Sequence, residues 1–219
     1  MGSVDLEFAE SLRRDVGIGR AVETGTFRGI TARALAGVFD LVVTIELFEP
    51  IHVAAKDALS DLTNVEALHG HSRDVLANLS SVEGPSLYFL DGHWSGGGTG
   101  GNDDQCPVLA ELEAIGPGNA NDVIIVDDAR LFTATPPPPM DPAQWPTAMA
   151  VFDAVRTGRP EHLVTILNDQ IVAVPPAGVA ALNTYGQRVN RESRAVVLAR
   201  TAAGMARDRM RRFRPSAAP

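Results

Sequence analysis

The sequence predicts an α/β domain with a seven-stranded, mostly parallel sheet, an antiparallel last strand and helices on both faces. Two observations carry this prediction: short apolar segments alternate with helical patterns, and only Asn168-Asp169-Gln170 separates the last two apolar segments. Alternating strands and helices form parallel sheets with right-handed crossovers, whereas a short connection joins antiparallel strands. The 219 residues, 45% of them hydrophobic, suffice for one domain with a full core.

Seven short apolar segments are expected to form the strands. Leu41–Leu47 is rich in β-branched residues and carries no charge before Glu46, which is typical of a buried strand. The last two segments should pair as a hairpin, so that the final strand runs in reverse. In chain order, the predicted strands are Ile18–Thr24, Leu41–Leu47, Val65–Leu68, Ser86–Leu90, Val123–Val126, Leu163–Leu167 and Ile171–Val174.

Prolines, glycines and capping residues bound the predicted helices. Pro50 suits the first turn of a helix, Ser72 opens another, and Gly116-Pro117 ends a third. The Gly-rich segment Ser95–Gly101 and the proline-rich segment Phe132–Pro146 are predicted to be loops. The predicted helices are Ile30–Phe39, Pro50–Leu62, Ser72–Leu79, Cys106–Ile115, Thr147–Thr157 and Asn190–Arg214.

The net charge of −8 combines an acidic body with a basic tail. Residues 1–187 hold 25 of the 27 acidic residues and 10 of the 19 basic ones, whereas residues 188–219 hold nine arginines and two acidic residues. We therefore predict a folded domain over residues 1–187 and a basic amphipathic helix and tail over residues 188–219. An apolar stripe on that helix predicts packing on a neighbour and a homodimer. The stripe consists of Leu198, Ala202, Ala206, Met210 and Phe213.

Cysteine usage and hydropathy favour a cytoplasmic protein. The single cysteine, Cys106, cannot form an internal disulfide, which fits a reducing compartment, and it is expected to be buried at the start of a helix. No apolar run approaches the roughly 18 residues that span a bilayer, and the first residues lack a signal-peptide pattern. We therefore expect no membrane partner.

Polar residues gather at the carboxyl ends of the first five predicted strands. Open parallel sheets bind their ligands at this edge, so the arrangement indicates a binding site. The residues concerned are Glu23 and Gly25, Glu46, His69 to Ser72, Asp91 and His93, and Asp127 and Asp128.

A glycine turn and an acidic residue suggest an adenosine-containing cofactor. Gly25 and Gly29 would let the backbone approach a ligand at the start of a helix. Glu46, about 20 residues further on, stands where a carboxylate can accept hydrogen bonds from two ribose hydroxyls. The alternative is structural, with a tight turn at Gly29 and a helix cap at Glu46.

Three aspartates predict a metal site. Asp91, Asp127 and Asp128 follow two strands that should be adjacent, and their mutual repulsion calls for a cation. Hard oxygen ligands suit Mg²⁺, with Mn²⁺ or Ca²⁺ as alternatives, and the structural alternative is a turn or cap. His93 is either a general base or a cap for the glycine loop.

Four motifs together resemble a known family. Glu23-Thr-Gly-Thr-Phe-x-Gly29, Ile45-Glu46, Phe89-Leu-Asp-Gly-His93 and Val126-Asp-Asp128 resemble class I S-adenosylmethionine (SAM)-dependent methyltransferases. More closely, they resemble the metal-dependent O-methyltransferases of the macrocin and sugar type. The resemblance covers about residues 15–176 and implies a Rossmann-like sheet whose seventh strand is reversed.

The resemblance also implies roles for individual residues. Glu46 would hold the ribose and Ser72 would lie near the adenine, while Asp91 would contact both the cofactor and the metal. The methionine part of SAM would be lined by Glu23, Gly25, Thr26 and Gly29. The Mg²⁺ ion would be bound by Asp91, Asp127 and Asp128.

The resulting prediction is methylation of a small-molecule hydroxyl, with a sugar or polyol as the preferred acceptor. Mg²⁺ would orient and acidify that hydroxyl, and Asp91 or His93 would take its proton. The only lysine, Lys56, follows the second strand away from the expected acceptor side, which disfavours a lysine base. The glycine and proline loops depart from the family where the acceptor should bind, so they leave its identity open.

Three other interpretations of the sequence compete with this one. The nine tail arginines could hold a nucleic-acid substrate, but the net charge of −15 over residues 1–187 and an aromatic content of 5% count against this. A non-catalytic assembly module would not need intact acids at the strand ends. A nicotinamide dinucleotide cofactor would call for a third glycine in the first turn, which the chain lacks.

Overall fold

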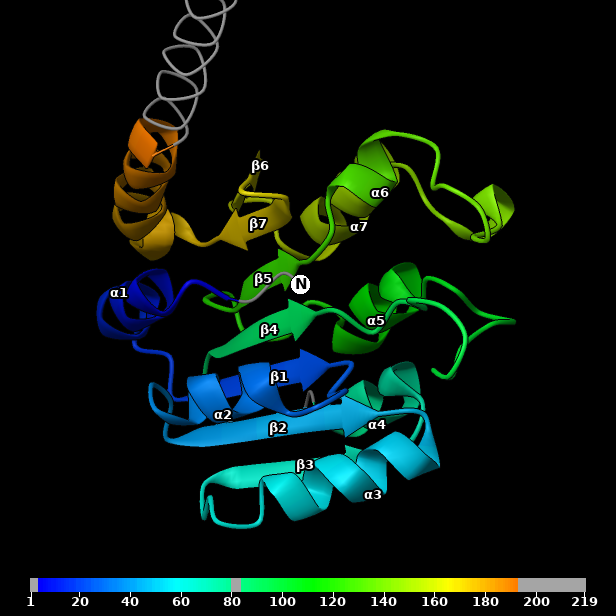
Figure 1. The fold of residues 1–219 in the computed structure, drawn as a ribbon. Coiled ribbons are helices and arrows are strands. Elements are labelled where there is room, and N and C mark those ends of the chain that lie inside the picture. The colour runs from blue at the N-terminus through cyan, green and yellow to red at the C-terminus, as the bar shows by residue number, and fades with distance from the viewer. Residues whose placement is uncertain (1–3, 80–83, 193–219) are drawn as a thin grey trace, which may run out of the picture. The chain divides into compact units, whose positions relative to one another are not determined.

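The computed structural model describes residues 4–79 and 84–192 (Figure 1). The chain divides into two compact units, residues 1–182 and residues 183–219, and the sheet lies entirely in the first. Residues 179–192 are helical. The apolar stripe predicted for the tail, and the dimer inferred from it, lie outside the described residues. Within those residues, no helix is long and apolar enough to cross a membrane.

The predicted seven-stranded sheet is confirmed. Its order is β3-β2-β1-β4-β5-β7-β6, with parallel pairing from β3 through β5 and antiparallel pairing of β7 with both β5 and β6. The strands are β1 (Arg20–Thr24), β2 (Leu41–Glu46), β3 (Val65–His69), β4 (Ser86–Leu90), β5 (Val123–Val126), β6 (Leu163–Leu167) and β7 (Gln170–Val174).

Strand register brings the strand ends together at one edge. Thr24 pairs with Ile45 on one side and with Leu90 on the other, and Leu90 pairs with Val126. The residue that follows each strand therefore lies beside the residue that follows the neighbouring strand. The N–H of Asp127, for example, donates to the carbonyl of Leu90 over 3.1 Å.

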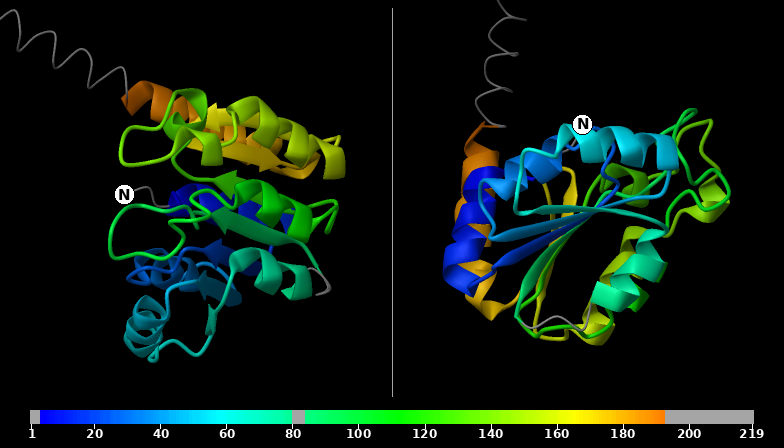
Figure 2. Two further views of the ribbon diagram at one scale, coloured as in Figure 1. Left: turned by 90° about the vertical axis from the view of Figure 1, so that its right-hand side faces the viewer. Right: turned by 90° about the horizontal axis from the view of Figure 1, so that it is seen from below.

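Helices cover both faces of the sheet, as Figure 2 shows, with α1, α2 and α3 on one face and α4, α5 and α7 on the other. Apolar side chains of β1, β2, β4 and β5 pack against α4, α5 and α7 in one continuous core, which includes Leu76, Leu112 and Val155. The helices are α1 (Leu6–Val16), α2 (Ile30–Ala36), α3 (Glu49–Ala58), α4 (Ser72–Leu79), α5 (Val108–Ile115), α6 (Arg130–Thr133) and α7 (Ala148–Gly158).

Two of these helices were not predicted from the sequence. Helix α1 begins at the N-cap Asp5, whose carboxylate accepts from the N–H of Phe8 over 2.9 Å, and it ends at Gly17. Helix α6 has only four residues and follows β5 almost directly. Such a short helix has too few positions to show a helical period, so sequence reasoning placed part of it in a loop.

The proline-rich loop is held by Gln105, a buried residue that follows the glycine-rich loop. Its side-chain oxygen accepts from the backbone N–H of Asp141 over 2.8 Å and from the indole N–H of Trp145 over 3.4 Å. Its own N–H donates to the side chain of Gln144, in the short 3-10 helix Pro142–Gln144. Hydrogen bonds therefore join the proline-rich loop to the segment that follows the glycine-rich loop.

Candidate active site

A cavity of about 420 Å³ opens at the carboxyl ends of the strands. Several predicted site residues line it: Gly25, Glu46, Ser72, Asp91, His93, Asp127 and Asp128. Others complete its wall: Phe27, Ile45, Leu47, Ile51, Gly70, His71, Gly92, Ser95, Thr99, Gly100, Asp104, Pro107 and Arg130. The cavity wall thus joins the first five strand ends to the glycine-rich loop and to the start of α6.

Gly25 provides a close backbone approach at the end of β1. Its φ is +84°, and a Cβ at this position would lie 2.3 Å from the carbonyl oxygen of Asp91. The turn after β1 therefore packs directly on the turn after β4, which only glycine permits. Gly29 (φ +70°) instead packs against Leu59, so it fixes the start of α2 and does not line the cavity.

Glu46 joins the two turns that flank the cavity. Its side chain is buried at the end of β2. One carboxylate oxygen accepts from the N–H of Phe27 over 3.0 Å, and the other accepts from the N–H of Phe48 over 2.9 Å. These bonds hold the carboxylate in one orientation in the cavity wall.

Glu23 and Thr26 lie behind the cavity wall and do not line it. Glu23 is 2% exposed, and its Oε2 accepts from the hydroxyl of Thr44 over 2.6 Å. The Thr44 hydroxyl is also 2.7 Å from that of Thr26. Burial raises the pKa of Glu23 to about 8 against the opposing effect of the Thr44 hydrogen bond, and the charges of Asp91 and Glu46 add to the rise.

We expect Glu23→Gln to stabilise the fold above neutral pH. Below pH 4.5 the Glu23 carboxyl is protonated in both the folded and the unfolded state. Between that pH and about pH 8 it ionises only in the unfolded chain, so the free energy of unfolding of the wild type falls as pH rises. Glutamine cannot ionise, so the free energy of unfolding of the variant, relative to the wild type, should rise by on the order of 3 kcal/mol between the two ends of this range. Urea unfolding at both ends measures the gain, with Glu66→Gln, on the exposed part of β3, as control. An equal difference at both pH values would contradict the assignment.

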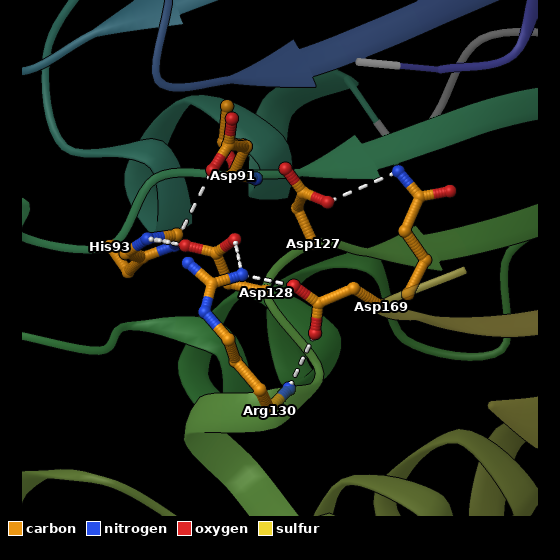
Figure 3. Close-up of polar contacts among 8 residues, drawn as sticks. Asp91, His93, Asp127, Asp128, Arg130 and Asp169 are labelled. Carbon is orange, nitrogen blue, oxygen red and sulfur yellow. Dashed lines mark hydrogen bonds and ion pairs between the residues drawn. The ribbon is translucent and has the colours of Figure 1, made fainter. Parts of the chain in front are cut away.

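Four ionisable side chains form a cluster beyond β4 and β5 (Figure 3). The Nδ1 of His93 lies 3.4 Å from Oδ1 of Asp91, and its Nε2 lies 3.0 Å from Oδ2 of Asp128. The imidazole ring therefore stands between two of the three predicted carboxylates. The third, Asp127, accepts from the side-chain amide of Gln170 over 3.1 Å.

Burial and neighbouring charges set the protonation of this cluster. Burial raises the pKa of Asp91 to about 7; the charges of Asp127 and Asp128 add to this, and His93 opposes it. Burial acts to lower the pKa of His93, but the hydrogen bond to Asp128 and the charge of Asp91 outweigh it and raise that pKa above its ordinary value. The hydrogen bond from His93 lowers the pKa of Asp128. Burial also raises the pKa of Asp127. With a pKa of about 7, Asp91 can accept a proton near neutral pH.

Arg130 is a site residue that sequence reasoning missed. Its Nη1 contacts Oδ1 of Asp128 over 2.6 Å and also pairs with Asp169, in the β6–β7 turn. Its position in the sequence, two residues after Asp128, could have indicated that Arg130 belongs to the site. No nearby sequence pattern indicates Asp169. His71, in the segment before α4, also lines the cavity, and sequence reasoning assigned it no separate role.

As arranged, the three aspartates do not fit a metal ion. His93 and Arg130 occupy the two oxygens of Asp128, and Gln170 binds one oxygen of Asp127. Among the residues that the structure describes, no three His, Cys, Asp or Glu side chains converge to hold a metal. The predicted ligands do come together in one cavity, but they are bound to side chains of the chain itself.

Two other sequence interpretations concern neighbouring residues. Cys106 is buried, as expected, and burial raises the pKa of its thiol to about 12. Lys56 is exposed on α3 and does not line the cavity. Neither Cys106 nor Lys56 lines the cavity, so neither can act on a ligand bound in it.

Several solved structures similar to this one are methyltransferases. A methyltransferase of Podospora anserina bound to S-adenosylhomocysteine (SAH) is 21% identical, with a TM-score of 0.53, over 80% of this chain and 79% of that one. An O-methyltransferase from Bacillus cereus in complex with SAH has 18% identity and a TM-score of 0.54, over 80% and 82% of the two chains. TomG, an O-methyltransferase from Streptomyces achromogenes in complex with SAM, has 22% identity and a TM-score of 0.51, with the same coverage.

These likenesses define the fold. The chain has the fold of the class I SAM-dependent methyltransferases, as its sheet order and reversed seventh strand indicated. The similar structures include O-methyltransferases bound to SAM or SAH. No protein-family profile matches the sequence, and a search of curated proteins found no similar chain.

Proposed function

We propose that the chain is a SAM-dependent O-methyltransferase that acts on a hydroxyl of a small molecule. The observation that carries this proposal is the cavity in which Gly25, Glu46 and the Asp91 cluster share one wall. The fold supports it, because open α/β sheets bind ligands at this edge. The SAM- or SAH-bound structures of the same fold support it further.

The cavity wall suits a nucleoside with a charged sulfur. Gly25 brings the backbone close to any occupant, and the Glu46 carboxylate is oriented to accept hydrogen bonds from ribose hydroxyls. The cavity wall includes apolar side chains that a purine ring could contact, those of Ile45, Leu47 and Ile51. Ser72 also lines the cavity. The carboxylates in the wall favour a positively charged ligand.

Bound SAM would supply a methyl group on a sulfonium, which an acceptor oxygen can displace in line. We infer that Asp91 takes the proton from the acceptor hydroxyl, because its pKa of about 7 leaves it partly ionised at neutral pH. His93 would keep its proton, orient Asp91 from 3.4 Å and stay fixed by Asp128.

A sugar or polyol hydroxyl is the acceptor that we propose. Five carboxylates and one arginine line the described cavity, so its wall offers many hydrogen-bond acceptors for hydroxyl groups and repels a polyphosphate. Ser95 and Thr99, from the glycine-rich loop, add hydroxyls on the same side. A homodimer and a cytoplasmic location, both inferred from the sequence, complete the proposal, and the mass in solution tests the first.

We expect Glu46→Ala to weaken the binding of S-adenosylhomocysteine by about 10- to 100-fold, because hydrogen bonds to a charged carboxylate are lost. Isothermal titration of the full chain measures the dissociation constant. Glu66→Ala removes an exposed glutamate from β3 and should leave it unchanged. An unchanged constant in Glu46→Ala, or no binding by the wild type, would reject the proposed cofactor site.

A further inference from the structure

Arg130 is held in place by both side-chain and backbone contacts. Its Nη1 pairs with Asp128 and with Asp169, and its backbone N–H donates to Oδ1 of Asp169 over 2.8 Å (Figure 3). The N–H of Ala129 also donates to the carbonyl of Asp169 over 2.7 Å. The β6–β7 turn therefore fixes the segment that carries both Asp128 and Arg130.

The conformation of Asp128 shows how closely this segment is constrained. Its φ is +56°, in the left-handed region that non-glycine residues rarely adopt. The turn residues Asn168 and Asp169 are also left-handed, at φ +51° and +63°. The Arg130 guanidinium contacts a residue of each left-handed segment, Asp128 and Asp169. The Asp128 carboxylate contacts both Arg130 and His93.

The carboxylates of the cluster are consequently bound within the chain. Arg130, whose guanidinium is charged at every pH of interest, contacts Asp128, and the His93 ring lies in the gap between Asp91 and Asp128. A divalent ion that used Asp128 would have to displace Arg130 from one oxygen or His93 from the other. One oxygen of Asp127 likewise accepts from Gln170, over 3.1 Å, which leaves this carboxylate one oxygen for an ion.

We propose that Arg130, fixed by Asp169, is the built-in counter-cation of this cluster and replaces the divalent metal that the sequence predicts. The proposal rests on the proposed function, because it concerns the same cavity. It assigns Arg130 the role of a positioning residue, which acts through Asp128 and His93 on the orientation of Asp91. The acceptor hydroxyl would then meet side chains of the protein and no metal ion.

Mn²⁺ binding to the full chain, followed by electron paramagnetic resonance, tests this proposal. The wild type and Arg130→Lys should show no stoichiometric binding in the micromolar range, because both keep a cation beside Asp128. Arg130→Met should bind Mn²⁺ at least about 10-fold more tightly, since the freed carboxylates need a counter-ion. Arg130 is 59% exposed, so the variant should fold. Arg156→Met, on the exposed end of α7, is the matched control and should behave as the wild type.

Two results would overturn the proposal. The first is stoichiometric micromolar Mn²⁺ binding by the wild type that disappears in Asp127→Asn. The second is equally weak binding by the wild type and Arg130→Met, because Arg130 would then not be what excludes the ion. S-adenosylhomocysteine titrated into the same samples separates the two hypotheses. If it fails to bind while the Mn²⁺ pattern holds, the proposed function and the positioning role of Arg130 fail together, and only its role as counter-cation stands.

Discussion

Asp91→Asn is expected to lower the rate of methyl transfer by about 10²- to 10⁴-fold, the usual contribution of a general base. Asparagine keeps the shape of the side chain but cannot take the acceptor proton. The backbone should stay in place, because the N–H of residue 91 donates to the carbonyl oxygen and to the hydroxyl of Thr24, each over 3.2 Å. Binding of S-adenosylhomocysteine should therefore change far less than turnover.

The pH profile gives this prediction a second readout. Burial raises the pKa of Asp91 to about 7, so the protein should lose activity as pH falls through that value and the carboxylate takes up a proton. The residual activity of Asp91→Asn should lack this acidic limb. Asp103→Asn, an exposed aspartate beyond the glycine-rich loop, is the control. Turnover in Asp91→Asn above a tenth of the wild-type value would exclude Asp91 as the base.

Gly25→Ala is expected to remove cofactor binding and to destabilise the fold. The added Cβ would lie 2.3 Å from the carbonyl oxygen of Asp91 and 2.9 Å from its carbonyl carbon, so the two turns would have to separate. Their separation would move both the glycine turn and Asp91, which together line one side of the cavity. Isothermal titration with S-adenosylhomocysteine and urea unfolding measure the two effects.

Gly17→Ala is the matched control for this variant. Gly17 has nearly the same φ, +80°, but a Cβ there would meet nothing within 4 Å. Both variants carry the cost of a left-handed alanine, about 1 kcal/mol, and Gly25→Ala should lose a further 1 to 3 kcal/mol from the close contact. Equal destabilisation, with cofactor binding retained in both, would show that the approach of the two turns is unimportant.

Local patterns predicted the framework well. The strands Ser86–Leu90, Val123–Val126 and Leu163–Leu167 begin and end where the sequence predicts, and the limits of the other strands differ by no more than a few residues. Such runs mark buried strands because both faces of a parallel sheet are covered. Helix α1 was missed although Asp5 caps it, since no strand pattern preceded it to prompt the search.

The strand ends illustrate how far sequence reasoning reached within the site. In a parallel sheet the last residues of neighbouring strands lie side by side, so Asp91 and Asp127, which follow the adjacent strands β4 and β5, were predictable as neighbours. Glu46, at the end of β2, was predictable at the same edge of the sheet, with β1 between it and β4. Glu23 also ends a strand, but its side chain points into the protein, where burial raises its pKa to about 8. Which face a side chain takes depends on packing around the strand, and a continuous apolar run carries no alternation that would reveal it.

The order of apolar and polar residues was therefore enough to establish the α/β architecture, the reversed seventh strand and the edge at which the cavity lies. It was not enough to establish which positive groups balance the negative charge of the aspartates at that edge. Asp169 is 39 residues from Arg130 in the chain, yet it binds both the backbone and the guanidinium of that residue. Contacts of this kind form only when β7 pairs with β5 and carries its turn to the site. Charge balance in a folded protein is set by distances in space, and a local sequence pattern specifies only neighbours along the chain.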